Sequence, residues 1–369
     1  MNHDLRIAQW VFPFLPALGG REIFTQRLTN TLVSRGHTVE VFAQPALNES
    51  ESNSPFRIHR LPVREIFTEN RANEVADVVG VLRERLANLD PDIVHIHTMG
   101  PEVLLLAQAL ELNGQSPQLI YTNHDLVLNS TDPRFAFFTY MAKKVDAITT
   151  ISQEAYSALC EKLPALRDKM VLIQNGVPIP IQPPVPAPLT GSVFSFGRLS
   201  PEKGFDVLIN AWARLQVSDR ALVITGDGGE LPYLKRLARS LGCESSVIFT
   251  GWLSEEKLGD QLGQCTFVVI PSIWNEPFGL VAAEAQAHGR AVIASNTGGL
   301  SEIVLDSVTG YLVTAGDVQA LTDAMSSLLA DPMRARLLGE SGHKRAAENL
   351  DFEVCVDNFE SLYEKLIGR

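Results

Sequence analysis

Residues 177–191, VPIPIQPPVPAPLTG, divide the chain into two stretches of similar pattern. The segment holds six prolines, and proline neither continues a helix nor donates a hydrogen bond in a central strand. We therefore expect a semi-rigid, extended connector between two domains. The length of 369 residues favours the same interpretation, because single hydrophobic cores rarely serve chains longer than about 300 residues.

On both sides of the connector, short β-branched apolar runs alternate with longer helical patterns. This alternation is typical of βα units that form a parallel sheet with helices on both faces. The strands are expected at 5–12, 38–44, 56–62, 92–98, 118–124, 147–152 and 170–176, and then at 192–199, 221–228, 247–253, 267–273, 291–295 and 310–314. We predict two doubly wound α/β domains, with ligands bound beyond the carboxyl ends of the strands.

Composition excludes several classes of protein. The 31 Lys and Arg against 43 Asp and Glu give a net charge of −12, which opposes a nucleic-acid partner. No apolar run reaches the roughly 18 residues of a membrane span, and MNHDLRIAQWVFPFLP (1–16) favours a first core strand over a signal peptide. We expect a cytoplasmic protein with neither a metal site nor disulfides, because its cysteines are scattered: Cys160, Cys243, Cys265 and Cys355.

Two glycine-rich junctions each allow two interpretations. Gly19 and Gly20 of PALGGRE (16–22) let a backbone approach an anion at a helix start, but a tight turn explains them equally well. ITGDGGEL (224–231) resembles a dinucleotide fingerprint, although Leu231 stands where the third glycine belongs. The pattern therefore does not favour a nicotinamide cofactor, and the glycines of this segment remain candidates for bordering a phosphate or a sugar.

Two cations converge in the loop FGRLSPEKG (196–204), where a strand ends near Gly197. Arg198 offers a planar fork for an oxyanion and Lys203 a mobile point charge. A solvated loop explains either cation alone, whereas the pair favours a diphosphate site. DPD (90–92) precedes the strand at 92–98, and so lies at the opposite end of the sheet from the expected site.

The stretch SIWNEPFGLVAAEAQAHG (272–289) holds Glu276 and Glu284 on either side of a helix start. Because Pro277 and Gly279 interrupt a continuous helix, we expect Glu276 in the loop and Glu284 two turns into the helix. An acid/base pair would require a substrate bond between the two carboxylates. The spacing favours two carboxylates that hold sugar hydroxyls, with the helix N–H groups open to an anion. An ordinary surface role remains the alternative for Glu284.

Several of these motifs together resemble glycosyltransferase family 4 over nearly the whole chain. They are GRLSPEKG (197–204), GDGGEL (226–231), VIFTGWLSEEKL (247–258) and PSIWNEPFGLVAAEAQAHGRAVIASNTGGLSEIV (271–304). The E-x7-E motif of the family is met by Glu276 and Glu284. The resemblance implies the GT-B fold, an α/β architecture of two Rossmann-like doubly wound domains that face a central cleft.

The resemblance also implies the domain roles. Residues 1–177 would bind the acceptor, 178–190 would be the linker, and 191–350 would bind a nucleotide-sugar donor. The last helical stretch, 351–369, would cross back onto the first domain.

Residue roles follow from the same resemblance. Glu276 would contact the transferred sugar and Glu284 the ribose, while Arg198 and Lys203 would bind the diphosphate. His124, in TNHD (122–125), would lie against the donor sugar, so that His124, Arg198, Lys203 and Glu276 form the catalytic set. The other implied donor contacts are Gly19, Gly20, Gly197, Gly226, Trp252, Leu253, Pro277, Phe278, Gly279 and Leu280.

The implied activity is transfer of a sugar, with retention, from a nucleotide-diphosphate sugar to a hydroxyl of a sugar, a lipid-linked or a small-molecule acceptor. A UDP-sugar is favoured and GDP-mannose is the alternative, without metal or cofactor. His97, Asn123 and Asp125 are candidate acceptor contacts, and His95 and His97 are expected on opposite faces of their strand. RFAFFTYMAKKVD (134–146) is either a helix packed on the sheet or a weak peripheral membrane contact at the inner face.

Two other functions fit a two-domain nucleotide-sugar protein. The first is a sugar-nucleotide epimerase or hydrolase, which would release an epimer or free sugar. The second is a catalytically silent nucleotide-sugar-binding subunit, which the presence of the full set of implied catalytic side chains disfavours.

Overall fold

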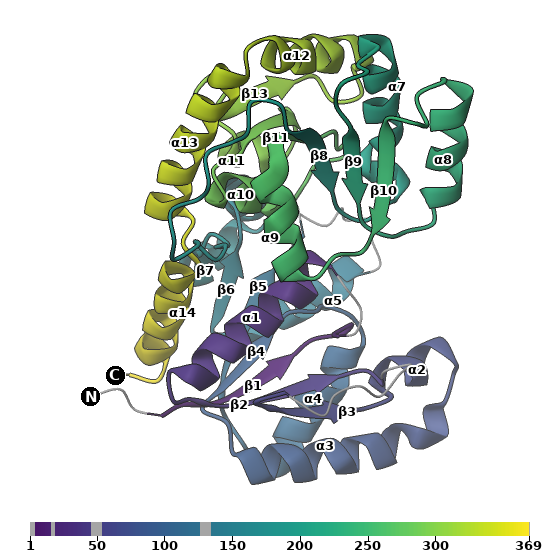
Figure 1. Ribbon diagram of the computed structural model, residues 1–369. Helices are drawn as coiled ribbons and strands as arrows, with labels where there is room; N and C mark the ends of the chain where they lie inside the picture. The colour runs from purple at the N-terminus through teal and green to yellow at the C-terminus, as the bar shows by residue number, and fades with distance from the viewer. Residues whose placement is uncertain (1–3, 16–18, 46–53, 126–133, 369) are drawn as a thin grey trace. The chain divides into compact units, whose positions relative to one another are not determined.

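The computed structural model describes residues 4–15, 19–45, 54–125 and 134–368. It divides into two compact units (Figure 1). Unit 1 comprises residues 1–174 and 356–369, and unit 2 comprises residues 175–355. Among the described residues, no helix combines the length and apolar character needed to cross a membrane.

Within the described residues, unit 1 contains a parallel sheet of seven strands in the order β3-β2-β1-β4-β5-β6-β7. The first strand along the chain, β1, lies in the middle of the sheet between β2 and β4 (Figure 1). The strands are β1 (Arg6–Trp10), β2 (Thr38–Ala43), β3 (Arg57–Arg60), β4 (Ile93–Ile96), β5 (Gln118–Asn123), β6 (Ala147–Thr150) and β7 (Met170–Leu172).

Helices connect the strands of unit 1. They are α1 (Gly20–Ser34), α2 (Val63–Thr68), η1 (Ala72–Glu74), α3 (Val75–Leu89), α4 (Glu102–Asn113), α5 (Arg134–Lys144), α6 (Gln153–Lys162) and η2 (Pro164–Lys169). The last helix, α14 (Phe352–Leu366), lies in unit 1 from Val356 onward. The chain therefore returns to unit 1 at Val356, within this helix.

The two faces of this sheet differ in chemistry. One face packs against α3, α4 and α5 in a hydrophobic core that includes Trp10, Phe42, Leu82, Val94, Leu106 and Phe138. The other face carries a row of polar side chains, which we call the polar row: Gln9, His95, His97, Thr122, His124 and Thr149. Rings of α1 and α14 contact this row, because Phe24 packs on His124 and Phe359 on His95.

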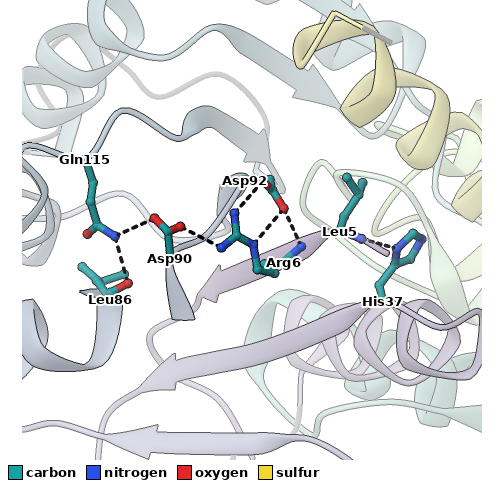
Figure 2. A network of polar contacts seen from close by, with 7 residues as sticks. All are labelled: Leu5, Arg6, His37, Leu86, Asp90, Asp92 and Gln115. Carbon is teal, nitrogen blue, oxygen red and sulfur yellow. Dashed lines mark hydrogen bonds and ion pairs between the residues drawn. The ribbon is translucent and has the colours of Figure 1, made fainter. Parts of the chain in front are cut away.

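The amino ends of β1 and β4 are joined by an ion-pair network (Figure 2). The guanidinium of Arg6 bonds Asp92 Oδ1 at 3.0 Å and Asp90 Oδ2 at 2.7 Å, and the backbone N–H of Arg6 donates to Asp92 Oδ2 at 2.9 Å. The pKa of Asp90 is lowered, chiefly by its hydrogen bond with Arg6. The two aspartates of the DPD segment therefore form ion pairs with Arg6, at the end of the sheet opposite His124.

Unit 2 holds a parallel sheet of six strands, counted over its described residues, in the order β10-β9-β8-β11-β12-β13. The strands are β8 (Ser192–Phe196), β9 (Leu222–Thr225), β10 (Val247–Gly251), β11 (Cys265–Ile270), β12 (Ala291–Ser295) and β13 (Gly310–Val313). All six residues of β11 are buried, as expected of a central parallel strand with helices on both faces.

The helices of unit 2 alternate with its strands. They are η3 (Pro201–Lys203), α7 (Phe205–Leu215), α8 (Leu231–Ser240), α9 (Glu255–Gln264), α10 (Leu280–Ala287), α11 (Leu300–Ile303), α12 (Val318–Ala330) and α13 (Pro332–Asn349). One hydrophobic cluster joins α7, α8, α12 and α13 to the sheet through residues that include Trp212, Leu234, Phe267, Leu321 and Leu338.

The proline-rich segment packs against unit 2 along much of its length. Thr266 Oγ1 donates to Pro188 O at 3.0 Å, Arg336 donates to Ala187 O at 2.8 Å, and Arg290 donates to Val185 O at 2.8 Å. The structure places the division at 174/175, so this segment belongs to unit 2 and is held by it. Every strand range predicted from the sequence overlaps an observed strand, and the two parallel-sheet α/β domains are confirmed.

Arg290 provides a test of how the segment is held. Its side chain, 1% exposed, bonds the carbonyl oxygens of Val185, Leu262, Gly263 and Gly289. We expect Arg290→Met to lower the free energy of unfolding by about 2–3 kcal/mol, because buried carbonyls lose charged donors. Thermal unfolding measures the loss. The exposed Arg239→Met variant serves as control, and equal stability of both variants would contradict this role.

Candidate functional site

In unit 2, the segments that follow the neighbouring strands β8 and β9 pack closely at the carboxyl edge of the sheet. Gly197 N donates to Thr225 O at 3.0 Å, and Leu199 N donates to Asp227 O at 2.9 Å. Gly226 has φ +139°, and a Cβ there would lie 1.8 Å from Gly197 O. Close backbone packing therefore explains why Gly226 is glycine, and its contact with a donor stays a prediction.

The carboxylate of Glu276 is held firmly in the loop after β11. Glu276 Oε1 accepts hydrogen bonds from Lys203 Nζ at 2.5 Å and from Ser272 Oγ at 2.6 Å. Its backbone oxygen accepts from Gly299 N at 2.7 Å. Glu276 is 8% exposed, and Oε2 makes no hydrogen bond with the residues that the structure describes. The arrangement leaves one oriented oxygen for a ligand.

Lys203 and Arg198 reach this edge of the sheet from the loop between β8 and α7. The loop is tied to the neighbouring one, because Ile273 N donates to Glu202 O at 3.0 Å. Lys203 Nζ lies 5.4 Å from the ring centroid of Trp274 in addition to its ion pair with Glu276. Arg198 is exposed to solvent. The structure thus brings Lys203 and Glu276 into contact and leaves Arg198 accessible.

Helix α10 begins next to Glu276. Gly279 is its N-cap with φ +97°, a conformation that L side chains rarely adopt, and Leu280 is the first helical residue. Pro277 and Phe278 precede the helix, which starts later than the sequence predicted. Glu284 is the fifth residue of α10, so it lies about one turn into the helix, and the prediction of two turns was wrong because the helix starts later.

The remaining implied donor contacts of unit 2 lie at the end of an edge strand. Trp252 and Leu253 directly follow β10, and Trp252 is 49% exposed. An exposed indole at a strand end can stack on a flat ring such as a nucleobase. Its role stays a prediction.

In unit 1, His124 follows β5 and belongs to a hydrogen-bonded chain. His124 Nε2 lies 2.9 Å from His97 Nδ1, and His97 Nε2 lies 2.7 Å from Gln9 Oε1. A second chain runs beside it: His95 Nδ1 lies 2.7 Å from the Tyr363 hydroxyl, and His95 Nε2 lies 2.6 Å from Thr122 Oγ1. These contacts link side chains of the polar row, on which rings of helices α1 and α14 pack.

Burial keeps the three histidines of the polar row uncharged. It lowers the pKa of His95 to about 3. It also lowers the pKa of His97 and of His124 well below the usual value, with smaller contributions from neighbouring histidines and from the positive charge of Arg21. His124 is half-buried while His95 and His97 are buried. At neutral pH, His124 therefore acts as a neutral hydrogen-bonding group.

The expectation that His95 and His97 point to opposite faces was wrong. Their ring centroids lie 4.0 Å apart on the same face of the sheet, because side chains two residues apart in a strand share a face. His97 and Asn123 are only 2% and 3% exposed, which favours a supporting role over acceptor contact, whereas Asp125 is half-buried.

Gly19 and Gly20 lie at the start of α1, as the N-cap and the first helical residue. The residues just before them, 16–18, lie outside the described part of the chain. Helix α5 (Arg134–Lys144) contributes Phe138 and Met141 to the core, which supports the packing interpretation of segment 134–146. Tyr140 is 44% exposed beside Lys144.

Sequence reasoning missed three residues that support the site. Gln9 is fully buried in β1, Ser272 bonds Glu276, and Tyr363 bonds His95 from α14. A glutamine inside the apolar strand RIAQW was an available signal, because buried polar side chains require partners. No group of three or more His, Cys, Asp or Glu suited to a metal ion occurs among the residues that the structure describes.

Two family matches together span most of the chain. Residues 18–179 match Glycosyltransferase Family 4, and residues 190–345 match glycosyl transferases group 1. With the two parallel-sheet domains described above, these matches show that the chain belongs to the family 4 glycosyltransferases of the GT-B fold. The protein is a glycosyltransferase.

Individual proteins are similar to this chain in sequence or in structure. A GDP-mannose-dependent alpha-(1-6)-phosphatidylinositol monomannoside mannosyltransferase of Mycolicibacterium smegmatis is 39% identical over 165 residues, 42% of this chain and 43% of that protein. A sucrose-phosphate synthase from Thermosynechococcus elongatus superposes with a TM-score of 0.81 at 25% identity, covering 98% of each chain. Anabaena HepE, in complex with UDP and glucose, has a TM-score of 0.79 at 22% identity and covers 97% and 99%.

The buried histidines predict sensitivity to acid. Because the pKa of His95 is about 3 in the folded state and about 6.5 in the unfolded chain, its contribution to stability is fully present above about pH 6.5. It is lost progressively as the pH falls toward 3. At pH 5 the loss is about 2 kcal/mol for this one group.

We therefore expect His95→Gln to show a smaller drop in unfolding temperature between about pH 7 and pH 5 than the parent protein. Thermal unfolding monitored by circular dichroism measures both drops. His343→Gln, a change in unit 2, is the control. Identical pH dependence of the parent and His95→Gln would contradict a neutral buried His95.

Proposed function

We propose that this glycosyltransferase moves a sugar, with retention of anomeric configuration, from a nucleotide-diphosphate sugar to a hydroxyl group of an acceptor. The observation that carries the proposal is the geometry around Glu276. Its carboxylate is bonded by Lys203 and Ser272, and it precedes the start of helix α10. An oriented carboxylate suits sugar hydroxyls, while a cation and helical N–H groups suit a diphosphate.

The chemistry requires stabilisation of the leaving group. The bond between the anomeric carbon and the phosphate oxygen breaks with its electron pair going to the diphosphate. The acceptor oxygen forms the new bond on the same face, and its proton passes to the leaving phosphate. Lys203, Arg198 and the N-terminus of α10 would offset the developing negative charge, so we propose that the reaction needs no metal ion and no cofactor.

Glu276 and Glu284 would hold opposite ends of the donor. The oxygen of Glu276 that makes no bond to the described residues would accept from hydroxyls of the transferred sugar. Glu284, on α10, would accept from the ribose hydroxyls. Trp252 and Leu253 would contact the base. This division assigns catalysis to the loop after β11 and nucleotide affinity to the helix.

The donor proposed is a UDP-sugar, with GDP-mannose as the alternative. HepE of Anabaena holds UDP and glucose on a similar fold, and the mycobacterial relative at 39% identity uses GDP-mannose. The acceptor proposed is a hydroxyl compound bound by unit 1. The N–H groups of α1 that follow Gly19 and Gly20 would approach the phosphate.

A panel of UDP-, GDP-, ADP- and TDP-sugars tests the proposal by thermal shift, since a ligand of the native state raises the unfolding temperature. We expect one nucleotide class to stabilise the protein, with or without EDTA. We also expect Lys203→Ala to lose this shift and to lower turnover roughly a hundredfold, the scale of one lost preorganised charge contact. The exposed Lys235→Ala variant is the control.

Release of free sugar or of an epimer, in place of transfer to an acceptor, would identify a hydrolase or an epimerase. An unchanged shift in Lys203→Ala would contradict the diphosphate assignment. Loss of the shift upon addition of EDTA would contradict metal independence.

The two glutamates should give different phenotypes. We expect Glu276→Ala to lower turnover and relax the choice of sugar, with little change in affinity for the free nucleoside diphosphate. We expect Glu284→Ala to weaken nucleotide binding by roughly tenfold, the scale of a hydrogen bond to a charged group. Calorimetric titration with UDP and GDP compares them. Equal losses of nucleotide affinity would contradict the division.

A further inference from the structure

The chain of hydrogen bonds that starts at Gln9 ends at His124. Gln9 is fully buried in β1, and its amide Oε1 faces His97 Nε2 at 2.7 Å. His97 in turn meets His124 through Nδ1 and Nε2 at 2.9 Å. Gln9 is therefore linked to His124 through a single side chain, that of His97, and does not bond His124 itself.

Stability alone does not explain a glutamine at this position. Gln9 Nε2 is buried and has no hydrogen-bond partner among the residues that the structure describes. An unpaired buried donor costs about 1–3 kcal/mol. An apolar side chain of similar size would remove that cost, so the one bond that Gln9 makes, to His97, is the feature that requires an explanation.

The bonds of this chain have a direction. Both imidazoles are neutral, because burial lowers their pKa values, and a neutral imidazole carries a single N–H. His97 Nε2 must donate to the amide oxygen of Gln9, which leaves His97 Nδ1 without a proton. His97 Nδ1 therefore accepts from His124 Nε2, and His124 Nδ1 is left as a lone pair.

We propose that Gln9 is a positioning residue which, through His97, holds His124 in the tautomer that carries its proton on Nε2 and presents Nδ1 as an acceptor for a sugar hydroxyl. The inference rests on the proposed function for the identity of the ligand. The half-buried His124 makes no bond through Nδ1 to the described part of the chain. The edge contact with Phe24, at 5.4 Å between centroids, holds the ring.

This tautomer selects the chemistry of the ligand. An acceptor nitrogen binds a group that donates, such as a sugar hydroxyl, and does not bind a group that only accepts, such as a phosphate oxygen. The opposite tautomer would present an N–H at Nδ1, which can donate to a hydroxyl oxygen and to a phosphate oxygen alike, so the discrimination between the two groups would be lost. Gln9 would thereby contribute to specificity for a hydroxylated sugar without contacting it.

The polar row offers a matched control. Thr149 is also fully buried and makes one side-chain hydrogen bond, to Thr122 at 2.6 Å. That chain continues to His95 and Tyr363, so it does not end at His124. Thr149→Val removes a buried hydrogen bond on the same face of the sheet and leaves the direction of the His97–His124 bond unchanged.

Nuclear magnetic resonance of the full-length protein labelled with 15N-histidine tests the proposal without any substrate. In the parent protein we expect the signals of His124, assigned by their absence in His124→Gln, to show a protonated Nε2 and an unprotonated Nδ1. Gln9→Met should shift His124 toward the other tautomer, and Thr149→Val should not. A protonated Nδ1 in the parent protein would overturn the proposal even if no Gln9 variant folds.

Turnover provides a second readout. We expect Gln9→Met to lower kcat about tenfold to a hundredfold, the range for lost supporting hydrogen bonds behind a site residue, with an unchanged affinity for the free nucleoside diphosphate. Thr149→Val should retain kcat. A Gln9→Met protein with the parent tautomer of His124 would overturn the proposal. If the parent protein shows the expected tautomer of His124 but has no transferase activity, only the proposed function is refuted.

Discussion

The structure of unit 1 depends on hydrogen bonds among a row of largely buried polar side chains on one face of its sheet. A parallel sheet is covered by helices on both faces, so polar groups there cannot rely on water. Gln9 Oε1, His97 and His124 are joined along one chain, although Gln9 Nε2 has no partner among the described residues, and the hydroxyl of Tyr363 bonds His95. Because Tyr363 comes from α14, helix α14 contributes to the hydrogen bonding of the polar row of unit 1.

Unit 2 holds a carboxylate and a cation in contact beyond the carboxyl end of a strand, and the contact occupies only one of the two carboxylate oxygens. Glu276 directs one oxygen to Lys203 and Ser272, and its other oxygen makes no hydrogen bond with the residues that the structure describes. The pair also neutralises a carboxylate that is only 8% exposed, which offsets the cost of burying its charge. If a diphosphate binds here, as proposed, the ammonium group of Lys203 is already held in place by Glu276.

Much of the fold follows from local pattern, and much of the site does not. Apolar runs and turn residues predicted each strand, and the E-x7-E spacing located Glu276 before a helix. The start of that helix was predicted too early, because Pro277 fits a first turn as well as it fits a loop. The faces of His95 and His97 were assigned wrongly although the period of a strand is two. The proline-rich segment is held by carbonyl contacts to Arg290 and Arg336, which no local pattern reveals.

The sequence by itself determined the two series of βα units, the proline segment between them, and the residue types at the strand ends. These are local properties of periodicity and turn chemistry. Only the tertiary structure decided that Ser272 and Lys203 share one oxygen of Glu276, and that Gln9 reaches His124 through His97. The physical reason is that hydrogen bonds between strands depend on register and on which helix covers which face, and both are set by the packing of distant segments.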